Sequence, residues 1–155
     1  MNSWRQQGNI WQLRPNRPQA LVEFIGGSYL AATPQVSYRR LLEDLCGQGL
    51  AVHAWTYVPG FDHQSQAQQA WRDLREARRK LEERCGVLPP SLRVGHSLGC
   101  KLHLLAPDGG RASRGLVALS FNNFAADRSI PLLGEIAPRL GVETEFSPSP
   151  QETLR

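Results

Sequence analysis

The feature that most constrains this chain is a Gly-x-Ser-x-Gly pattern, formed by Gly95, Ser97 and Gly99 directly behind a short apolar run. The pattern is typical of a nucleophile elbow, a sharp strand-to-helix turn that presents a serine at its tip. The glycines have a steric role, because a serine at strained backbone angles needs neighbours without a Cβ. We therefore predict a strand up to Gly95 and a helix from Leu98. The alternative interpretation is an ordinary strand–turn–helix junction.

Composition indicates one globular domain over residues 1–155, since 41% of the residues are hydrophobic and 21% are charged. Nothing in the sequence approaches the ~18 consecutive apolar residues of a membrane span, and the N-terminus lacks the apolar region of a secretory signal. The three cysteines are widely spaced and odd in number, which favours reduced thiols in a cytoplasmic compartment over disulfides or a zinc site.

The formal charge of +4 raises the possibility of nucleic-acid binding, but its distribution argues against it. The densest basic stretch, residues 72–84, has arginines and lysines spaced four residues from glutamates. This spacing is typical of a solvated helix face with i,i+4 ion pairs, each contributing only a few tenths of a kcal/mol. We expect no nucleic-acid partner.

Strand and helix patterns alternate along the chain. The predicted strands are residues 10–13, 20–25, 50–58, 92–95, 115–121 and 142–146, and the predicted helices are residues 36–46, 66–85, 98–106 and a short helix end at 136–140. This alternation predicts an α/β fold with a mainly parallel sheet covered by helices on both faces. In such sheets the chemistry lies beyond the carboxyl ends of the strands.

The loop after the second predicted strand, Gly26-Gly27-Ser28-Tyr29, is a candidate oxyanion hole. In an α/β-hydrolase one backbone N–H at this position and the N–H of the residue after the nucleophile bind the oxyanion. We assign these roles to the loop around Gly27 and Ser28 and to Leu98. The alternative is a plain strand-to-helix turn.

A serine nucleophile needs a base to accept its proton and an acid to orient that base. His63 and Asp127 each follow a predicted strand and are the candidates. Alternatively, His63 caps the next helix or is solvated. Asp127 alternatively caps a turn or forms an ion pair.

In α/β-hydrolases the catalytic histidine follows the serine in the chain. The only histidine after Ser97 in this sequence is His103. His103 lies about 9 Å further along the predicted helix, and His96 leaves the turn in another direction. The triad is therefore predicted to be incomplete.

Several longer segments resemble an uncharacterised family of α/β-hydrolase-like proteins of cyanobacteria and plastids, the domain of unknown function 1350. They are residues 24–28, 34–39, 61–63, 95–103, 121–131 and 143–150. The resemblance covers nearly the whole chain. It implies a hydrolase-like fold, a location in the cytoplasm or plastid stroma, and a longer protein with more strands after residues 147–150. It supplies no substrate.

Together these features predict a serine hydrolase acting on a small ester or acyl substrate, without a cofactor or metal. Ser97 is the predicted nucleophile. The alternative is a non-catalytic protein that keeps the elbow for folding and uses the same cleft or the sheet surface to bind a partner. If the C-terminal part of the fold is missing, an uncovered sheet edge is expected to promote self-association.

Overall fold

A computed structural model describes residues 2–125, 128 and 145–153. Within these residues a six-stranded sheet forms the centre, in the order β1-β2-β4-β3-β5-β6. The strands are β1 (Arg5–Gln7), β2 (Ile10–Leu13), β3 (Ala20–Ile25), β4 (Leu50–Trp55), β5 (Ser91–His96) and β6 (Leu116–Leu119). The run β4-β3-β5-β6 is parallel, whereas β1 and β2 join its β4 side as antiparallel strands.

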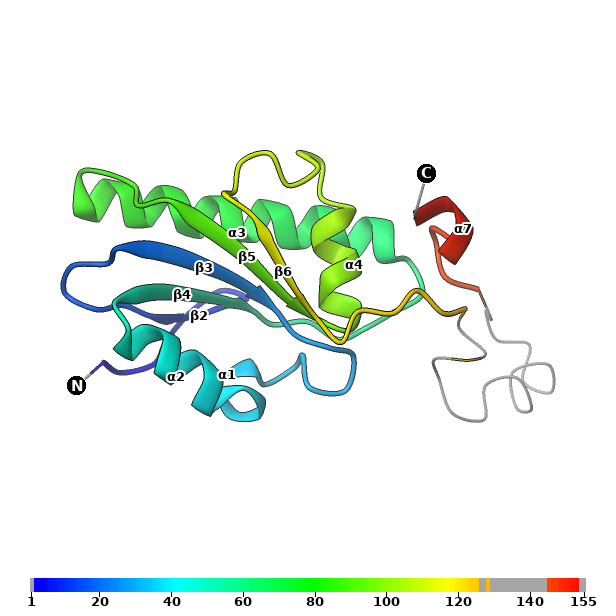
Figure 1. Cartoon of the computed structure of the whole chain (residues 1–155), viewed down its shortest axis with the longest axis horizontal. Coiled ribbons are helices and arrows are strands. Elements are labelled where there is room, and N and C mark those ends of the chain that lie inside the picture. The colour runs from blue at the N-terminus through cyan, green and yellow to red at the C-terminus, as the bar shows by residue number, and fades with distance from the viewer. Residues whose placement is uncertain (1, 126–127, 129–144, 154–155) are drawn as a thin grey trace.

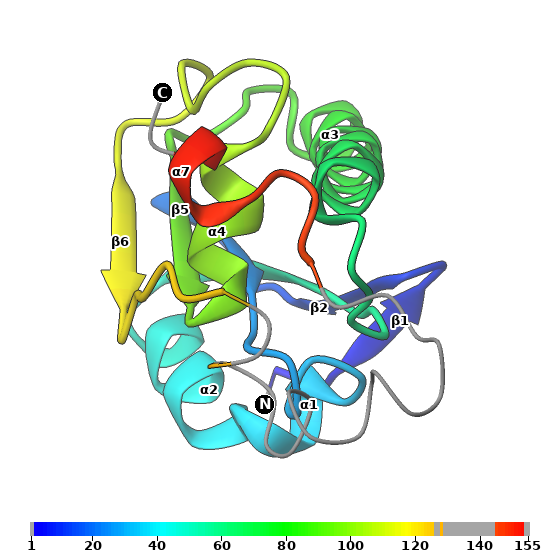
Figure 2. The same ribbon diagram turned by 90° about the vertical axis from the view of Figure 1, so that its right-hand side faces the viewer.

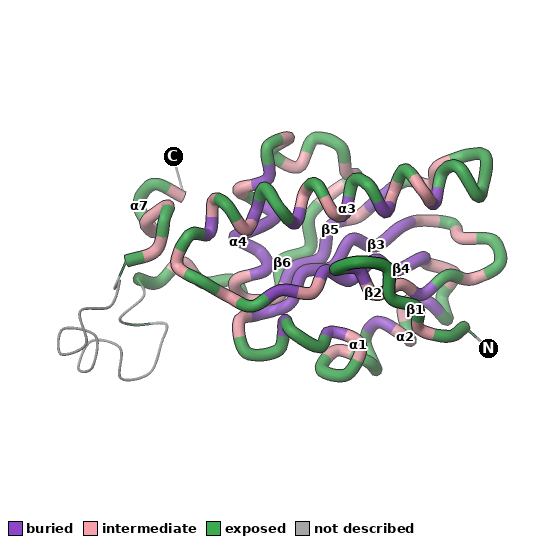
Figure 3. Tube along the Cα trace, turned by 180° about the vertical axis from the view of Figure 1, so that it is seen from behind, coloured by how far each residue is buried: buried purple, intermediate pink, exposed green. Residues whose placement is uncertain are grey.

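Helices cover both faces of this sheet (Figure 1). α1 (Pro34–Ser37) and α2 (Arg39–Gly47) lie on one face, and α3 (His63–Cys85) and α4 (Leu98–Leu104) lie on the other. β3 and β4 are buried at five of their six positions, as expected for parallel strands covered on both sides. Figure 3 shows the buried residues concentrated in the sheet, with exposed residues on the outward side of α3.

The predicted α/β fold, mainly parallel and covered on both faces, is confirmed, but several boundaries differ. The helix predicted over residues 36–46 is divided at Tyr38 into α1 and α2. The strands predicted over 50–58 and 115–121 are shorter than expected, because pairing with their neighbours ends at Trp55 and Leu119. The helix predicted to begin at residue 66 begins at His63, because the Asp62 side chain accepts a hydrogen bond from the Ser65 amide at 3.0 Å and caps it.

β1 was not predicted from the sequence. Its three residues are polar and exposed, so the sequence has no apolar pattern there that predicts a strand. These residues form a strand because they pair with β2 across the turn at Gly8 (φ 56°). The predicted helix end at 136–140 and residues 142–144 of the last predicted strand lie outside the described residues. Within the described part of the chain, no helix is both long enough and apolar enough to cross a membrane.

The parallel strands end on the right of Figure 1, where α7 (Pro150–Thr153) also lies. Figure 2 looks at this end of the sheet and shows β6 standing at its edge. Trp55 and Tyr57 stack at 4.7 Å where β4 ends, and the Tyr57 hydroxyl donates to the Gly26 carbonyl at 2.7 Å. These contacts fix the chain segments that leave β3 and β4, and therefore the loops around Ser97.

A Gly99→Ala substitution is expected to destabilise the fold by about 3 kcal/mol or more. A Cβ on Gly99 would overlap the Ile25 carbonyl at the end of β3, which is backbone and has little room to move. Gly47→Ala is the matched control, because a Cβ there meets nothing within 4 Å. Urea unfolding of both variants measures the difference, and equal stability of the two would contradict the close packing of α4 on β3.

Candidate active site

Ser97 lies between β5 and α4 with φ 51° and ψ −118°, a conformation in which a non-glycine residue is strained. Its amide donates to the Leu119 carbonyl at 2.9 Å, which ties the turn to β6. A Cβ on Gly95 would lie 2.6 Å from the Cys100 amide nitrogen. The turn therefore requires glycines at Gly95 and Gly99, where the sequence has them.

Ser97 opens on a cavity of about 400 Å³ at the carboxyl end of the sheet. The cavity also receives His63 from the start of α3, Lys101 from α4 and Phe146 from the segment before α7. Of the residues that the sequence singled out, it brings together Gly27, Ser28, His63, Ser97 and Leu98. Asp127 lies outside the described residues.

The loop after β3 packs directly on the elbow. A Cβ on Gly27 would lie 3.0 Å from the His96 Nδ1 and 3.2 Å from the Ser97 Cβ, which is closer than an ordinary van der Waals contact. The Gly27 amide, however, donates to the Tyr38 hydroxyl at 2.8 Å. In this conformation that amide is not available to a substrate oxygen, which differs from the role expected for it. The cause is Tyr38, which no pattern in the sequence placed beside this loop. The neighbouring Ser28 amide has no hydrogen-bond partner among the described residues.

Two histidines near the elbow have hydrogen-bond partners other than Ser97. The His96 Nδ1 lies 2.7 Å from the Tyr38 hydroxyl, and His96 lines the same cavity as Ser97. The His103 ring is buried with its Nε2 3.2 Å from the Val94 carbonyl, and burial lowers its pKa to about 3. Neither ring makes a hydrogen bond with the Ser97 hydroxyl among the described residues.

His63 was predicted in a loop but is the first residue of α3, and only 1% of it is exposed. Its ring lies 4.3 Å from the Phe146 ring, and neither ring nitrogen has a hydrogen-bond partner among the described residues. Burial, with a smaller contribution from the Lys101 ammonium, lowers the pKa of His63 to about 4, although the nearby Gly60 backbone and Asp62 oppose the shift. The imidazole is therefore neutral at pH 7.

Lys101 is a site residue that sequence reasoning missed. It is 4% exposed, its Nζ donates to the Pro148 carbonyl at 2.8 Å, and the Nζ lies 5.4 Å from the Phe146 ring centre. Burial lowers its pKa to about 8. The available signal was a lone lysine among the apolar residues of the predicted elbow helix. A positive charge in this cavity disfavours protonation of His63.

The arrangement presents a serine hydroxyl and a neutral imidazole to one cavity without a hydrogen bond between them. Among the described residues the Ser97 hydroxyl makes no hydrogen bond, and no carboxylate contacts His63. Asp62, its neighbour in sequence, caps α3 instead. In the described parts of the chain, no group of three or more His, Cys, Asp or Glu side chains is arranged to hold a metal ion.

A family model described as "Protein of unknown function (DUF1350)" matches residues 3–155. No curated protein matches the sequence.

Solved structures with similar folds include a Bacillus licheniformis lipase, with 15% identity, TM-score 0.66, and coverage of 97% of this chain and 64% of that one. A carboxyl esterase from Tuber melanosporum has 20% identity, TM-score 0.57, and coverage of 94% and 54%. A dienelactone hydrolase from Anabaena variabilis has 17% identity, TM-score 0.55, and coverage of 78% and 62%. These likenesses show an α/β-hydrolase fold, and the chain spans less than two thirds of the length of each of these proteins.

The buried histidines predict that stability falls as the pH drops from about 6.5 to about 4. His53 and His63 have pKa values lowered to about 4 and His103 to about 3, from an ordinary 6.5. Below pH 6.5 the unfolded chain takes up protons that the folded chain does not, so unfolding is favoured until the folded pKa values are reached. His63→Phe should reduce this dependence by about one proton, or ~1.4 kcal/mol per pH unit near pH 5. Urea unfolding over this pH range measures it, and an unchanged slope would mean that His63 is not buried in its neutral form.

Proposed function

The chain belongs to the DUF1350 family and has the fold of the α/β-hydrolases, and from this premise we propose that it is a serine hydrolase acting on an ester or related acyl bond. Ser97 is the nucleophile. The observation that carries the proposal is the position of Ser97, at positive φ between β5 and α4, with its side chain in a cavity. This is the strained turn by which α/β-hydrolases present their nucleophile.

Stabilisation of the oxyanion is proposed to come from the amides of Leu98 and Ser28. Leu98 is the first residue of α4, so its amide has no carbonyl within the helix to bind. The Ser28 amide takes the role expected for Gly27, whose own amide binds Tyr38. A single oxyanion donor is worth on the order of 100- to 1,000-fold in rate. Asp127 remains the candidate acid.

The base is the weak part of this site. His63 reaches the cavity and is neutral, which is the form that accepts a proton, but its lowered pKa makes it a poor base. No carboxylate orients its ring among the described residues. The chain is therefore proposed to carry the nucleophile and oxyanion groups of a hydrolase whose base is absent or weak.

We expect the isolated chain to have little esterase activity and to react slowly with fluorophosphonates. A serine without a base stays protonated at neutral pH, and sites lacking a triad member keep only about 1,000- to 10,000-fold acceleration over water. Slow labelling confined to Ser97, and lost in Ser97→Ala, supports the proposal. Mass spectrometry of the labelled peptides identifies the modified residue.

Ser65→Ala is the control, because Ser65 is exposed in the first turn of α3 and does not line the cavity that holds Ser97. Strong labelling lost in Ser97→Ala would show that the site is complete. If His63→Ala removes it as well, His63 is the base. No labelling of Ser97, even at long exposure, would reject the hydrolase proposal and favour a non-catalytic binding protein.

A binding role is supported by a second observation, the exposure of β6. All four of its residues are exposed, and Leu116, Val117 and Leu119 are apolar. β6 is the last strand in the sheet order of the described residues, and an exposed apolar edge strand pairs readily with another chain. We propose that two copies associate through β6.

Val117→Lys is expected to weaken this self-association, because a charge on an edge strand opposes pairing. Val87→Lys, at a more exposed valine after α3, is the matched control. Sedimentation velocity over a range of concentrations measures the assembly state. A wild-type chain that stays monomeric at high concentration would contradict the proposal.

The compartment is proposed to be reducing, such as the cytoplasm or the plastid stroma. Cys46, Cys85 and Cys100 are all free thiols, as is usual where glutathione and thioredoxin keep cysteines reduced.

A further inference from the structure

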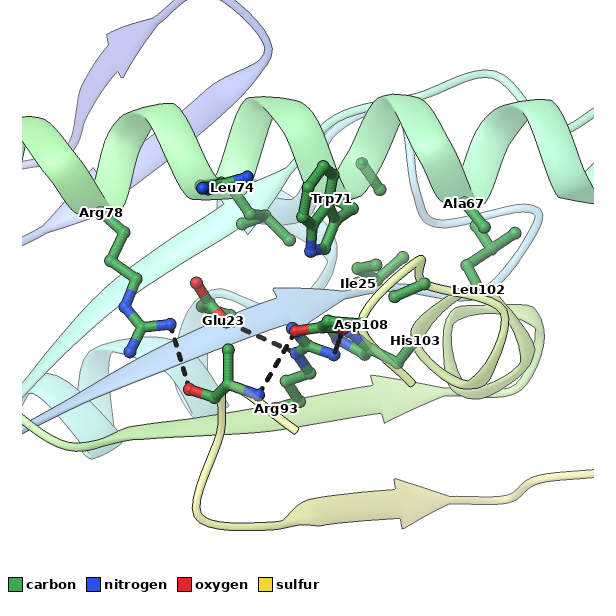
Figure 4. A pocket seen from close by; sticks show the side chains of 14 residues that line it. Glu23, Ile25, Ala67, Trp71, Leu74, Arg78, Arg93, Leu102, His103 and Asp108 are labelled. Carbon is green, nitrogen blue, oxygen red and sulfur yellow. Dashed lines mark hydrogen bonds and ion pairs between the residues drawn. The ribbon is translucent and has the colours of Figure 1, made fainter. Parts of the chain in front are cut away.

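A second cavity, of about 290 Å³, lies between α3, α4 and the sheet, on the buried side of the elbow helix (Figure 4). Its walls are apolar and come from both layers, including Ile25 from β3, Trp71 and Leu74 from α3, and Leu102 from α4. Its floor is ionic. Glu23 stands in the middle of β3 beside Arg93 of β5, and neither residue lines the cavity that holds Ser97.

Glu23 is the carboxylate of this floor. It is 3% exposed, and its close partner among the described residues is the Arg93 guanidinium, whose Nε lies 3.7 Å from the Glu23 Oε2. A buried carboxylate held by one long ion-pair contact is costly, because that contact replaces only part of the water it has lost.

Arg93 faces Glu23 with its Nε only, because its two terminal nitrogens donate to the two Asp108 oxygens at 2.8 and 2.6 Å, a bidentate pair. Asp108 also accepts from the Gly110 amide at 3.0 Å. The Glu23 carboxylate therefore has room to accept a further donor from the cavity that it lines.

The opposite side of the cavity offers a cation. Arg78 extends from α3 and donates one N–H to the Ala112 carbonyl at 3.1 Å, while its buried Nε has no hydrogen-bond partner among the residues that the structure describes. Figure 4 shows Arg78 reaching down from α3 and Glu23 rising from β3 towards the same space. The cavity therefore places an acceptor and a donor of opposite charge beside an apolar wall.

We propose that this cavity binds a small zwitterion with an apolar side chain, of the class of the aliphatic and aromatic α-amino acids. The ligand's ammonium donates to the Glu23 carboxylate, its carboxylate accepts from Arg78, and its side chain packs against Leu74, Trp71 and Leu102. A ligand of this kind supplies a partner for the Arg78 Nε and a further donor to Glu23 at once. The volume lies just below the ~300–1,000 Å³ of sites for drug-sized molecules, which suits a ligand of amino-acid size.

The protonation of Glu23 is consistent with such a ligand. Burial raises the pKa of Glu23, and the charges of Arg93 and Arg78 oppose that shift only in part. A bound ammonium group next to the carboxylate favours its ionised form. If Glu23 is protonated in the free site, ligand binding is therefore accompanied by release of that proton.

The test is calorimetric titration of the whole chain with L-leucine, leucinamide and 4-methylpentanoate. Leucinamide lacks the carboxylate, and 4-methylpentanoate lacks the ammonium group. Leucine is expected to bind saturably at one site and to raise the unfolding temperature. Each analogue is expected to bind about 10- to 100-fold more weakly, the loss typical of one hydrogen bond to a charged group.

Two variants assign the contacts. In Glu23→Gln the preference for leucine over 4-methylpentanoate should disappear, and in Arg78→Gln the preference for leucine over leucinamide should disappear. Arg72→Gln, on the exposed side of α3, is the matched control and should leave both preferences unchanged. If Glu23→Gln does not fold, Arg78→Gln and the two analogues still test the site.

Failure of L-leucine, L-methionine and L-phenylalanine all to bind would overturn the proposal, as would equal binding of leucine and both analogues. Binding that is unaffected by Arg78→Gln would also reject it. Because no residue of the Ser97 cavity is changed, reaction of Ser97 with fluorophosphonate should be the same in Arg78→Gln and in the unaltered chain. This assay therefore separates the amino-acid site from the proposed hydrolase site.

Discussion

The structure depends on the close approach of α4 to the end of β3. Gly99 packs directly against the Ile25 carbonyl, and Gly95 leaves room for the Cys100 backbone. Side chains at these two positions would separate helix and strand, and Ser97 would lose the positive φ that directs its hydroxyl into the cavity. The same contact sets the position of the Gly27 loop against Ser97. One steric constraint therefore couples the packing of the fold to the geometry of the candidate site.

The core next to this contact is more polar than its α/β fold requires. His53, Glu23 and Arg93 occupy neighbouring positions across β4, β3 and β5 on the face covered by α3. Buried ionisable groups are costly unless they are paired or neutral. Arg93 pairs with Asp108 and His53 is held neutral, which leaves Glu23 as a buried carboxylate held by the 3.7 Å contact with the Arg93 Nε. The proposed ligand site follows from this imbalance.

Most of the fold was accessible from the sequence because its signals are local. Apolar runs predicted β3 to β5, and the two glycines around Ser97 predicted the elbow. The errors occur where tertiary contacts, not local sequence, determine the secondary structure. β1 has no apolar residue to predict it. α1 and α2 divide at Tyr38, whose hydroxyl accepts a hydrogen bond from the Gly27 amide. For the same reason the sequence could place His63 near the site, but it could not show that Phe146 packs against the His63 ring or that burial and the Lys101 charge lower its pKa.

The most direct test of this account is the backbone conformation of Ser97 in a high-resolution crystal structure of the chain. The account predicts a positive φ near 51°, with the hydroxyl facing the cavity that His63 also lines and the Gly99 backbone against the Ile25 carbonyl. A Ser97 with negative φ inside a regular helix, or a hydroxyl turned away from that cavity, would contradict both the elbow and the hydrolase proposal built on it.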